Sequence, residues 1–436
     1  MLAPLLLVLL SSTSTQSLGL AEAVRLGLAH APAVEAGSLA IRQAELAQRR
    51  AALERVRLRV DAQVAELWAR SDLTSSRGEA SGGALGLSNL SANLEVPVFS
   101  GFRVESAIDR TQALFDASAH ELHSIEQGTA LAITRAYWAV RRAELLLAVE
   151  LEAERRLVDA ERRAIARSKT GLAPEAERAR AEAGRRLQAA VVAERRAQQN
   201  EVWTQLSTLL GDPSDQFPSD QVMLLPLPGP LPELIDEALA TRPELAAARA
   251  RALAADHGIK EARSGYYPNL SVSGLVQYGN NPLLAGAGAR AVFAAANPFA
   301  GLGADVQVGA VVSINLFDTF TTTTQVAQAE AEAARLERLS ADRAQRLVTE
   351  VEGAYLRLAR HHAVAAHLKE AHQSAAESTQ LLSRRYRDGD STLFELLEAE
   401  LARLEIERRQ ALNDADGTLA GFELAAARGR LLGDLR

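Results

Sequence analysis

The sequence predicts a mixed α/β membrane protein that is internally duplicated, in which each chain contributes four strands to a shared β-barrel and also forms long helices. Three observations predict this fold class. The two halves of the chain repeat one another, four segments alternate apolar and polar residues, and two proline-free runs are long enough for helices of about 100 Å. Together they indicate one architectural unit used twice.

The duplication is visible as a fixed spacing between matched residues. Gly171 matches Gly389, and Tyr137 matches Tyr355, each at half of the 436-residue length. Near the start of each half the spacing is shorter, which indicates a longer loop in the second half. We expect a signal peptide at residues 1–17, a first structural repeat at residues 18–218 and a second at residues 219–436, and we do not expect the repeats to be independent domains.

Composition excludes several classes of function. The net charge of −7 does not indicate the basic surface that nucleic-acid-binding proteins need. The chain has no cysteine, which excludes disulfides, thiolate metal sites and cysteine-linked lipid anchors. Residues 2–10 are apolar and are followed by small polar residues, as in an export signal, although no Lys or Arg precedes them. No other apolar run reaches the roughly 18 residues of a membrane helix, so any membrane contact must use strands.

Four segments alternate apolar and polar residues, which predicts strands with one apolar and one polar face. The segments are residues 56–64, 90–98, 270–278 and 306–316. Each half thus holds one strand pair, joined by a loop rich in Gly, Ser and Ala at residues 71–84 or 279–304. The alternative is a half-buried sheet in a soluble protein, but the strands are about as long as the roughly 9–11 residues of a membrane strand.

Most of the remaining chain is predicted to be helical. Residues 102–169 and 320–388 contain no proline, and each run predicts one long helix. Pro174 fits the first turn of a returning helix, and Ser391 or Thr392 fits an N-cap. Short helices at residues 18–30 and 231–241 and medium ones at residues 33–55 and 244–263 open the two halves. The order in each half is therefore helix, helix, strand, strand, long helix, long helix.

Four strands predict an assembly. They are too few to close a barrel, since known outer-membrane barrels have at least about eight. Lipid excludes an open sheet edge because its backbone groups would have no hydrogen-bond partner. Two or more chains must therefore share one barrel. Leu94, Val96, Val272, Val308, Ala310 and Val312 are expected to face lipid, and Asn93, Ser271, Gln307 and Ser313 the lumen.

Ordered, duplicated motifs carry a resemblance to a known family. They are Leu20-x-Glu22 with Ala29-x-x-Pro32, Leu231-x-Glu233 with Ala240-x-x-Pro243, Tyr267-Pro268-Asn269, Val96-Pro97-Val98-Phe99, Ile314-Asn315-Leu316-Phe317 and Tyr386-Arg387-Asp388-Gly389. With them the chain resembles the TolC-like outer-membrane efflux proteins, or outer membrane factors, over nearly its whole length after Ser17. Arg57 departs from the pattern, because a proline is expected where the second half has Pro268.

The resemblance implies a function and partners. It implies a homotrimer with a twelve-stranded barrel in the outer membrane of a Gram-negative bacterium and a helical tunnel crossing the periplasm. Such a channel conducts substrates to the exterior in a tripartite efflux pump or a type I secretion system. Its implied partners are a periplasmic adaptor (membrane fusion protein) and an inner-membrane pump of the RND, ABC or MFS type. Alternatives from other classes are a periplasmic adaptor and a coiled-coil scaffold of an export system.

The resemblance also points to a channel gate at Glu395 and Glu398. Residues three apart share a helix face, so three chains would gather six carboxylates around one axis. Such a ring attracts cations, and its like charges repel one another. The alternative is that both glutamates are ordinary surface residues. The matching positions of the first half are Glu177 and Arg180, so only the second half supplies an acidic pair.

The two turns between the long helices are the expected adaptor-docking tip. Gly171 and Gly389 suit the left-handed backbone that ends a helix. The tip residues expected to take part in docking are Gly171, Leu172, Tyr386, Gly389 and Leu393. The alternative is that the glycines serve only as helix caps.

No catalytic, cofactor or metal site is expected. His120 and His123 have a spacing that can present two rings to one metal, but no Cys or third His stands nearby in the sequence. The chain also lacks a nucleophile–base motif and a phosphate-binding loop. We therefore do not expect an enzyme.

Overall fold

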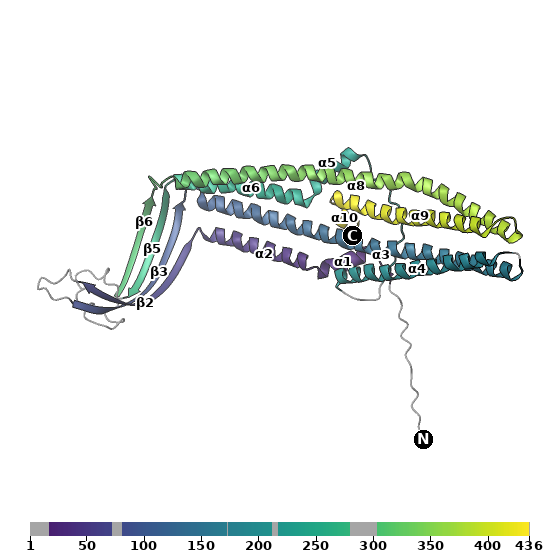
Figure 1. Ribbon diagram of the computed structural model, residues 1–436. Coiled ribbons are helices and arrows are strands. Elements are labelled where there is room, and N and C mark those ends of the chain that lie inside the picture. The colour runs from purple at the N-terminus through teal and green to yellow at the C-terminus, as the bar shows by residue number, and fades with distance from the viewer. Residues whose placement is uncertain (1–16, 72–80, 172, 212–216, 280–302, 436) are drawn as a thin grey trace, which may run out of the picture. The chain divides into compact units, whose positions relative to one another are not determined.

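The computed structural model describes residues 17–71, 81–171, 173–211, 217–279 and 303–435 (Figure 1). The expected signal peptide, apart from Ser17, and most of the loop at residues 279–304 lie outside these residues. The elements of the first half are β1 (Ser17–Leu18), α1 (Leu20–His30), α2 (Pro32–Leu53), β2 (Arg57–Ser71), β3 (Ser81–Phe99), α3 (Arg103–Lys169) and α4 (Glu175–Leu210). Those of the second half are β4 (Phe217–Pro218), α5 (Leu231–Thr241), α6 (Pro243–Arg263), η1 (Ser264–Tyr266), β5 (Asn269–Gly279), β6 (Gly303–Ser313), α8 (Thr321–Asp388), α9 (Leu393–Ala427) and α10 (Leu431–Asp434).

The two halves have the same order of elements, as the repeat predicts. The long helices α3 and α8 contain 67 and 68 residues. Pro174 is the N-cap of α4 and so lies one position before the predicted first turn. Thr392 is the N-cap of α9, where its side chain and that of Glu395 form a capping box. Among the described helices, none carries an apolar stretch that would let it cross a membrane.

One antiparallel four-stranded sheet combines the strand pairs of both halves. Its order is β2-β3-β5-β6, so β3 of the first half pairs with β5 of the second. Two strand ends lie at other residues than the sequence predicts. Ser81 already belongs to β3, where it pairs with Ser71, although a loop was expected there. Strand β6 ends at Ser313, opposite Asn269, because the next partner would be Pro268, which has no N–H to donate.

The described chain forms two compact units, and each unit takes segments from both halves. One contains residues up to Leu39, His120–Ala246 and the chain from Ala341 onward, while the other contains Ala40–Ala119 and Ala247–Ser340. The first, which we call the helical unit, holds buried clusters around Tyr137, Val351 and Tyr386. The second, which we call the sheet unit, holds the four-stranded sheet and the helix ends attached to it.

The segment between the repeats is fixed to the helical unit through one buried tyrosine. The hydroxyl of Tyr137 donates to the Asp220 carboxylate at 2.6 Å and accepts from the Ser219 amide at 3.1 Å. Asp220 also accepts from the Leu20 amide at 2.6 Å. Burial, together with Asp220, raises the pKa of Tyr137 above its ordinary value. The hydroxyl therefore stays protonated and holds the start of each repeat in place.

Candidate functional site

The apolar face of the sheet is exposed to its surroundings. One cross-strand row on this face consists of Leu58, Leu94, Gly274 and Val308, and the next consists of Val60, Ala92, Val276 and Val306. Val308 is 79% exposed, and Leu58 and Val60 are also exposed. A sheet in a soluble protein buries such a face against a second layer. The apolar rows are those that a lipid-facing surface requires.

The opposite face of the sheet is predominantly polar. The register places Arg59, Asn93 and Gln307 in one row, with Leu275 between the last two. The residues expected to face lipid and those expected to face a lumen thus lie on opposite faces. Leu275 and Val311 are apolar residues on this face, and alternation in the sequence alone did not single them out.

The sheet has two unpaired edges among the described residues. Strand β2, with 15 residues, pairs only with β3, and strand β6, with 11 residues, pairs only with β5. Each edge therefore presents free backbone N–H and C=O groups. In lipid these groups would cost several kcal/mol each unless another strand paired with them.

The turns of the long helices enclose a small core. Ala164 of α3, Ala181 of α4, Tyr386 of α8 and Leu393 and Leu396 of α9 are buried together. This core therefore joins four helices.

Tyr386 carries the polar contacts of this core. Its hydroxyl donates to Glu177 at 3.3 Å, and the Arg167 guanidinium lies 4.8 Å from the centre of its ring. Burial, and after it the nearby Glu177 carboxylate, raises the pKa of Tyr386. We call these helix ends, with their two turns, the tip.

The docking residues expected from the sequence separate into three groups. Tyr386 and Leu393 are both 0% exposed, so they build the tip core and do not present side chains to a partner. Their place in this core depends on which helix face turns inward, which the local sequence does not determine. Gly171 and Gly389 have φ angles of 71° and 93°, and an added Cβ would meet nothing within 4 Å. Leu172 lies outside the described residues.

An exposed aromatic residue at the tip was missed by the sequence reasoning. Phe394 is 57% exposed, and the Arg180 guanidinium lies 5.4 Å from the centre of its ring. Phe394 directly follows the buried Leu393 on α9, so it points away from the core. An aromatic residue beside a predicted turn was the available signal.

The two proposed gate residues are exposed near the start of α9. Glu395 accepts a hydrogen bond from the Thr392 amide at 2.9 Å, and the Thr392 hydroxyl accepts one from the Glu395 amide at 3.3 Å. Glu395 therefore already stabilises the helix start. Glu398 lies on the exposed surface one turn later. The matching Glu177 and Arg180 contact Tyr386 and Phe394, as described above.

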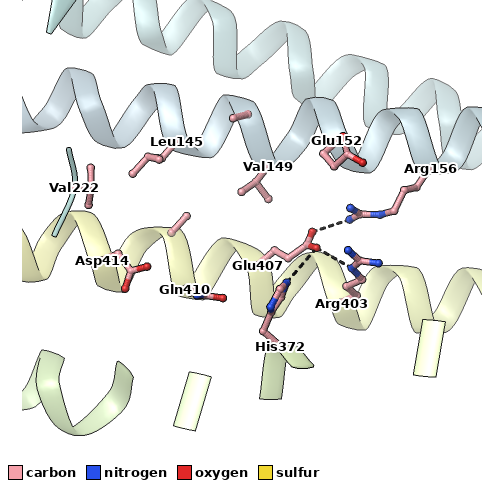
Figure 2. Close-up of a pocket in the computed structure, with 12 residues that line it drawn as sticks. Leu145, Val149, Glu152, Arg156, Val222, His372, Arg403, Glu407, Gln410 and Asp414 are labelled. Carbon is pink, nitrogen blue, oxygen red and sulfur yellow. Dashed lines mark hydrogen bonds and ion pairs between the residues drawn. The ribbon is translucent and has the colours of Figure 1, made fainter. Parts of the chain in front are cut away.

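A cavity of about 450 Å³ lies between α3 and α9 in the helical unit (Figure 2). Its apolar wall includes Leu145, Val149 and Val222. Its charged side centres on the Glu407 carboxylate, whose partners are Arg156 at 2.7 Å, Arg403 at 2.8 Å and His372 at 3.6 Å.

The ion pairs of this cavity join the two helical hairpins. Burial alone would raise the pKa of Glu407, but hydrogen bonds from Arg156 and Arg403 outweigh burial and lower it. Arg156 also binds Glu400 at 2.8 Å. One arginine of α3 thus holds two carboxylates of α9, and the cluster ties the two hairpins together. Among the described residues, no set of His, Cys, Asp and Glu side chains is arranged to hold a metal ion, and this includes His120 and His123.

A second buried carboxylate reinforces the same junction. Glu150 of α3 is 0% exposed and accepts two hydrogen bonds from Arg408 of α9, at 2.7 and 2.8 Å. Gln188 of α4 donates a third at 2.7 Å. Burial raises the pKa of Glu150, but these hydrogen bonds outweigh it and the pKa is lowered. Glu150 therefore stays ionised and ties three helices together.

Comparison with known proteins gives a family and a fold. Residues 234–430 match the outer membrane efflux protein family, and a search of curated proteins found no significant match. The outer membrane protein VceC of Vibrio cholerae is 17% identical with a TM-score of 0.77, and the likeness covers 94% of this chain and 96% of VceC. The outer membrane channel CmeC of Campylobacter jejuni is 15% identical with a TM-score of 0.78, over 94% of this chain and 86% of CmeC. The open state of the MtrE outer membrane channel of Neisseria gonorrhoeae is 17% identical with a TM-score of 0.74, over 95% of this chain and 89% of MtrE.

These findings confirm the resemblance seen in the sequence and its fold class. The solved structures share the fold of this chain, with its long helices and one four-stranded sheet, and the family match covers most of the second repeat. The matched family is one of channels and not of enzymes. Residues 234–430 therefore match the outer membrane efflux protein family, and the chain has the fold of the TolC-like outer-membrane channels.

Proposed function

We propose that three copies of this chain close one twelve-stranded barrel in the outer membrane and continue as a helical duct in the periplasm. One observation carries the proposal: a sheet with an exposed apolar face and two unpaired edges. Three such sheets pair all their edges and direct the apolar faces to lipid, whereas one sheet alone does neither. The polar face then lines the lumen.

The duct is passive. Cargo enters it from the periplasm or from an inner-membrane transporter of the RND, ABC or MFS type, in a tripartite efflux pump or a type I secretion system. A periplasmic adaptor (membrane fusion protein) joins the duct to that transporter. The ion pairs of Glu150 and Glu407 keep the two hairpins together while cargo passes.

The adaptor docks at the tip. Gly171 and Gly389 form the two turns there, and open space surrounds both of them. The exposed apolar contact is Phe394, because Leu393 and Tyr386 are buried. A ring of aromatic residues beside the turns suits the apolar anchors that helical hairpins use for packing.

Glu395 and Glu398 form the gate of the duct. Both carboxylates are exposed on α9, close to the turn. Three copies bring them around one axis, where they attract cations and repel one another.

The decisive test is the oligomeric state and conductance of the purified chain. In detergent, light scattering is expected to give a trimer, and the trimer is expected to conduct ions in planar bilayers. A monodisperse folded monomer would contradict the shared barrel. A periplasmic adaptor or a scaffold, the alternatives from the sequence, would fractionate with soluble proteins and would not conduct.

A further inference from the structure

A second cavity of the helical unit, of about 250 Å³, lies between α3, α4 and α9. Each helix lines it with residues at steps of three and four, which share one helix face. The lining residues are Ala139, Arg142, Ala143 and Leu146 of α3, Arg195, Gln198 and Val202 of α4, and Arg408 and Leu412 of α9. The cavity therefore combines three guanidinium groups with an aliphatic wall, and no acidic residue is among the described residues that line it.

Two carboxylates outside the lining are the partners of these guanidinium groups. The buried Glu150 accepts hydrogen bonds from Arg408 at 2.7 and 2.8 Å, and one of its oxygens lies 3.8 Å from Nε of Arg195. Asp416 lies 3.4 Å from Nε of Arg142. Those last two side chains are 37% and 48% exposed, so water weakens their attraction.

The three cations thus share two carboxylates, which leaves one positive charge at the cavity. The hydrogen bond to Glu150 raises the pKa of Arg408, and the nearby Glu405 adds to this effect. Glu405, however, has an ion pair of its own with Arg409 at 2.8 Å. A single anion inside the cavity would complete the charge balance.

Arg195 is the side chain that most needs another hydrogen-bond acceptor. Its Nη1 donates to Gln198 at 2.9 Å, but its Nε is buried and has no hydrogen-bond acceptor among the described residues. A buried N–H without an acceptor is destabilising. The planar guanidinium group presents its donors as a fork that matches the two oxygens of a carboxylate.

The larger cavity between α3 and α9 has the opposite character. Figure 2 shows its three acidic residues, Glu152, Glu407 and Asp414, beside Arg156 and Arg403. An anion entering that cavity would meet carboxylates. The two cavities therefore differ in the charge of the ligand that they favour.

We propose that the cavity between α3, α4 and α9 is a binding site for a small organic anion, with a carboxylate on Arg142 and Arg195 and an apolar body against Leu146, Val202 and Leu412. Its volume is below the roughly 300–1,000 Å³ of pockets for drug-sized ligands, so a compact acid fits best. The site is built by one chain alone. It is therefore independent of the duct proposed above and adds a function to the helical unit.

Binding of naphthylacetate to the purified full-length chain tests the site. Ligand-observed NMR at low salt is expected to give a dissociation constant of about a millimolar or lower. Naphthylacetamide has the same apolar body without the charge, and it also reports how far that body enters the detergent micelle. We expect the amide to bind at least about tenfold more weakly, since it cannot form charge-assisted hydrogen bonds.

Three variants locate the bound anion. Arg142→Gln and Arg195→Gln each remove one guanidinium group and are expected to weaken binding about tenfold or more. Ala139→Leu fills the cavity without changing its charge and is expected to abolish binding. The matched control is Arg196→Gln, because Arg196 is exposed beside Arg195 and does not line the cavity. It should bind like the wild type.

Thermal unfolding gives a second readout and shows that each variant folds. Naphthylacetate is expected to raise the midpoint of the wild type and of Arg196→Gln, because a ligand of the folded state stabilises it. It should not raise the midpoint of Arg195→Gln or Ala139→Leu.

Equal binding of naphthylacetate and naphthylacetamide would overturn the anion site. Undiminished naphthylacetate binding by folded Arg195→Gln and Ala139→Leu would place the anion elsewhere and would also overturn it. A protein that binds the anion as expected but neither forms trimers nor conducts ions would contradict the duct and leave this site standing.

Discussion

At the scale of single residues, buried and exposed carboxylates have different roles in this chain. Glu150 is enclosed by Arg408 and Gln188, and its charge is used within the fold. Glu395 and Glu398 are exposed near the tip, where their charges can attract cations from solution. Neutralising Glu150 should therefore lower the stability of the fold, whereas neutralising Glu395 and Glu398 should change conduction.

Removing the buried carboxylate is expected to destabilise the helical unit. Glu150→Ala leaves the half-buried Arg408 and the buried Gln188 without this hydrogen-bond acceptor, which costs about 1–3 kcal/mol in the free energy of unfolding. The control Glu152→Ala removes only an exposed pair with Arg155 and should cost at most about 1 kcal/mol. Denaturant unfolding of the two purified variants measures the difference. Similar midpoints would show that the Glu150 contacts contribute no stability.

The same carboxylate predicts a pH dependence of stability. The pKa of Glu150 is lowered in the folded state, so its contribution is complete above the unfolded carboxyl value of about 4.5 and is lost as pH falls through the folded value. Acid unfolding of the wild type should therefore be steeper than that of Glu150→Gln. Parallel acid transitions in the two proteins would argue against this linkage.

Neutralising the exposed pair is expected to change conduction and not folding. The double variant Glu395→Gln and Glu398→Gln keeps the capping box, because glutamine also serves at that position. If the carboxylates ring the gate, the wild-type channel prefers cations and is blocked by multivalent cations from the periplasmic side. Single-channel recordings of the variant should show this block removed. An unchanged block would place the constriction elsewhere.

At the scale of elements, the tip and the sheet each have one side for packing and one for contact. On α9, Leu393 points into the tip core and the next residue, Phe394, points out of it. On β6, Gln307 and Val308 lie on opposite faces of the sheet in the same way. Neighbouring residues in one element therefore provide matched pairs of variants.

The neighbours on α9 separate packing from docking. Leu393→Ala removes a fully buried side chain and should lower the free energy of unfolding by about 2–5 kcal/mol. Phe394→Ala should leave stability and trimer unchanged and reduce export in cells, since it removes the exposed tip contact. Export assays beside thermal unfolding measure both effects. Normal export by Phe394→Ala would assign docking to other residues.

The neighbours on β6 distinguish lipid from lumen. Val308→Arg places a charge on the lipid-facing side and should cost about 2–4 kcal/mol near the membrane centre. Gln307→Arg should fold normally and change conductance. Folding in lipid vesicles gives the first quantity and bilayer recording the second. Equal tolerance at the two positions would mean that this strand is not embedded in lipid.

The sequence predicted these elements well where the deciding physics is local. Alternation predicted the strands, and absence of proline predicted α3 and α8. An N-cap was predicted at Ser391 or Thr392, and Thr392 is the cap. Local pattern could not place Tyr386 and Leu393, which looked like surface anchors but are buried by contacts from other helices. It also could not pair Glu150 with Arg408, because those residues lie far apart in the chain.

At the scale of the whole molecule, the sheet order has a consequence for symmetry. Pairing β3 with β5 joins the trailing edge of the first repeat to the leading edge of the second. In the proposed ring, β6 pairs with β2 of the next copy. This pair also joins the last strand of one repeat to the first strand of another. Three duplicated chains thus form a quasi-sixfold ring with two alternating kinds of junction. The junction within the chain holds an ion pair between α3 and α6, and different residues meet at the junction between chains. Duplication therefore allows the two kinds of junction to differ in chemistry.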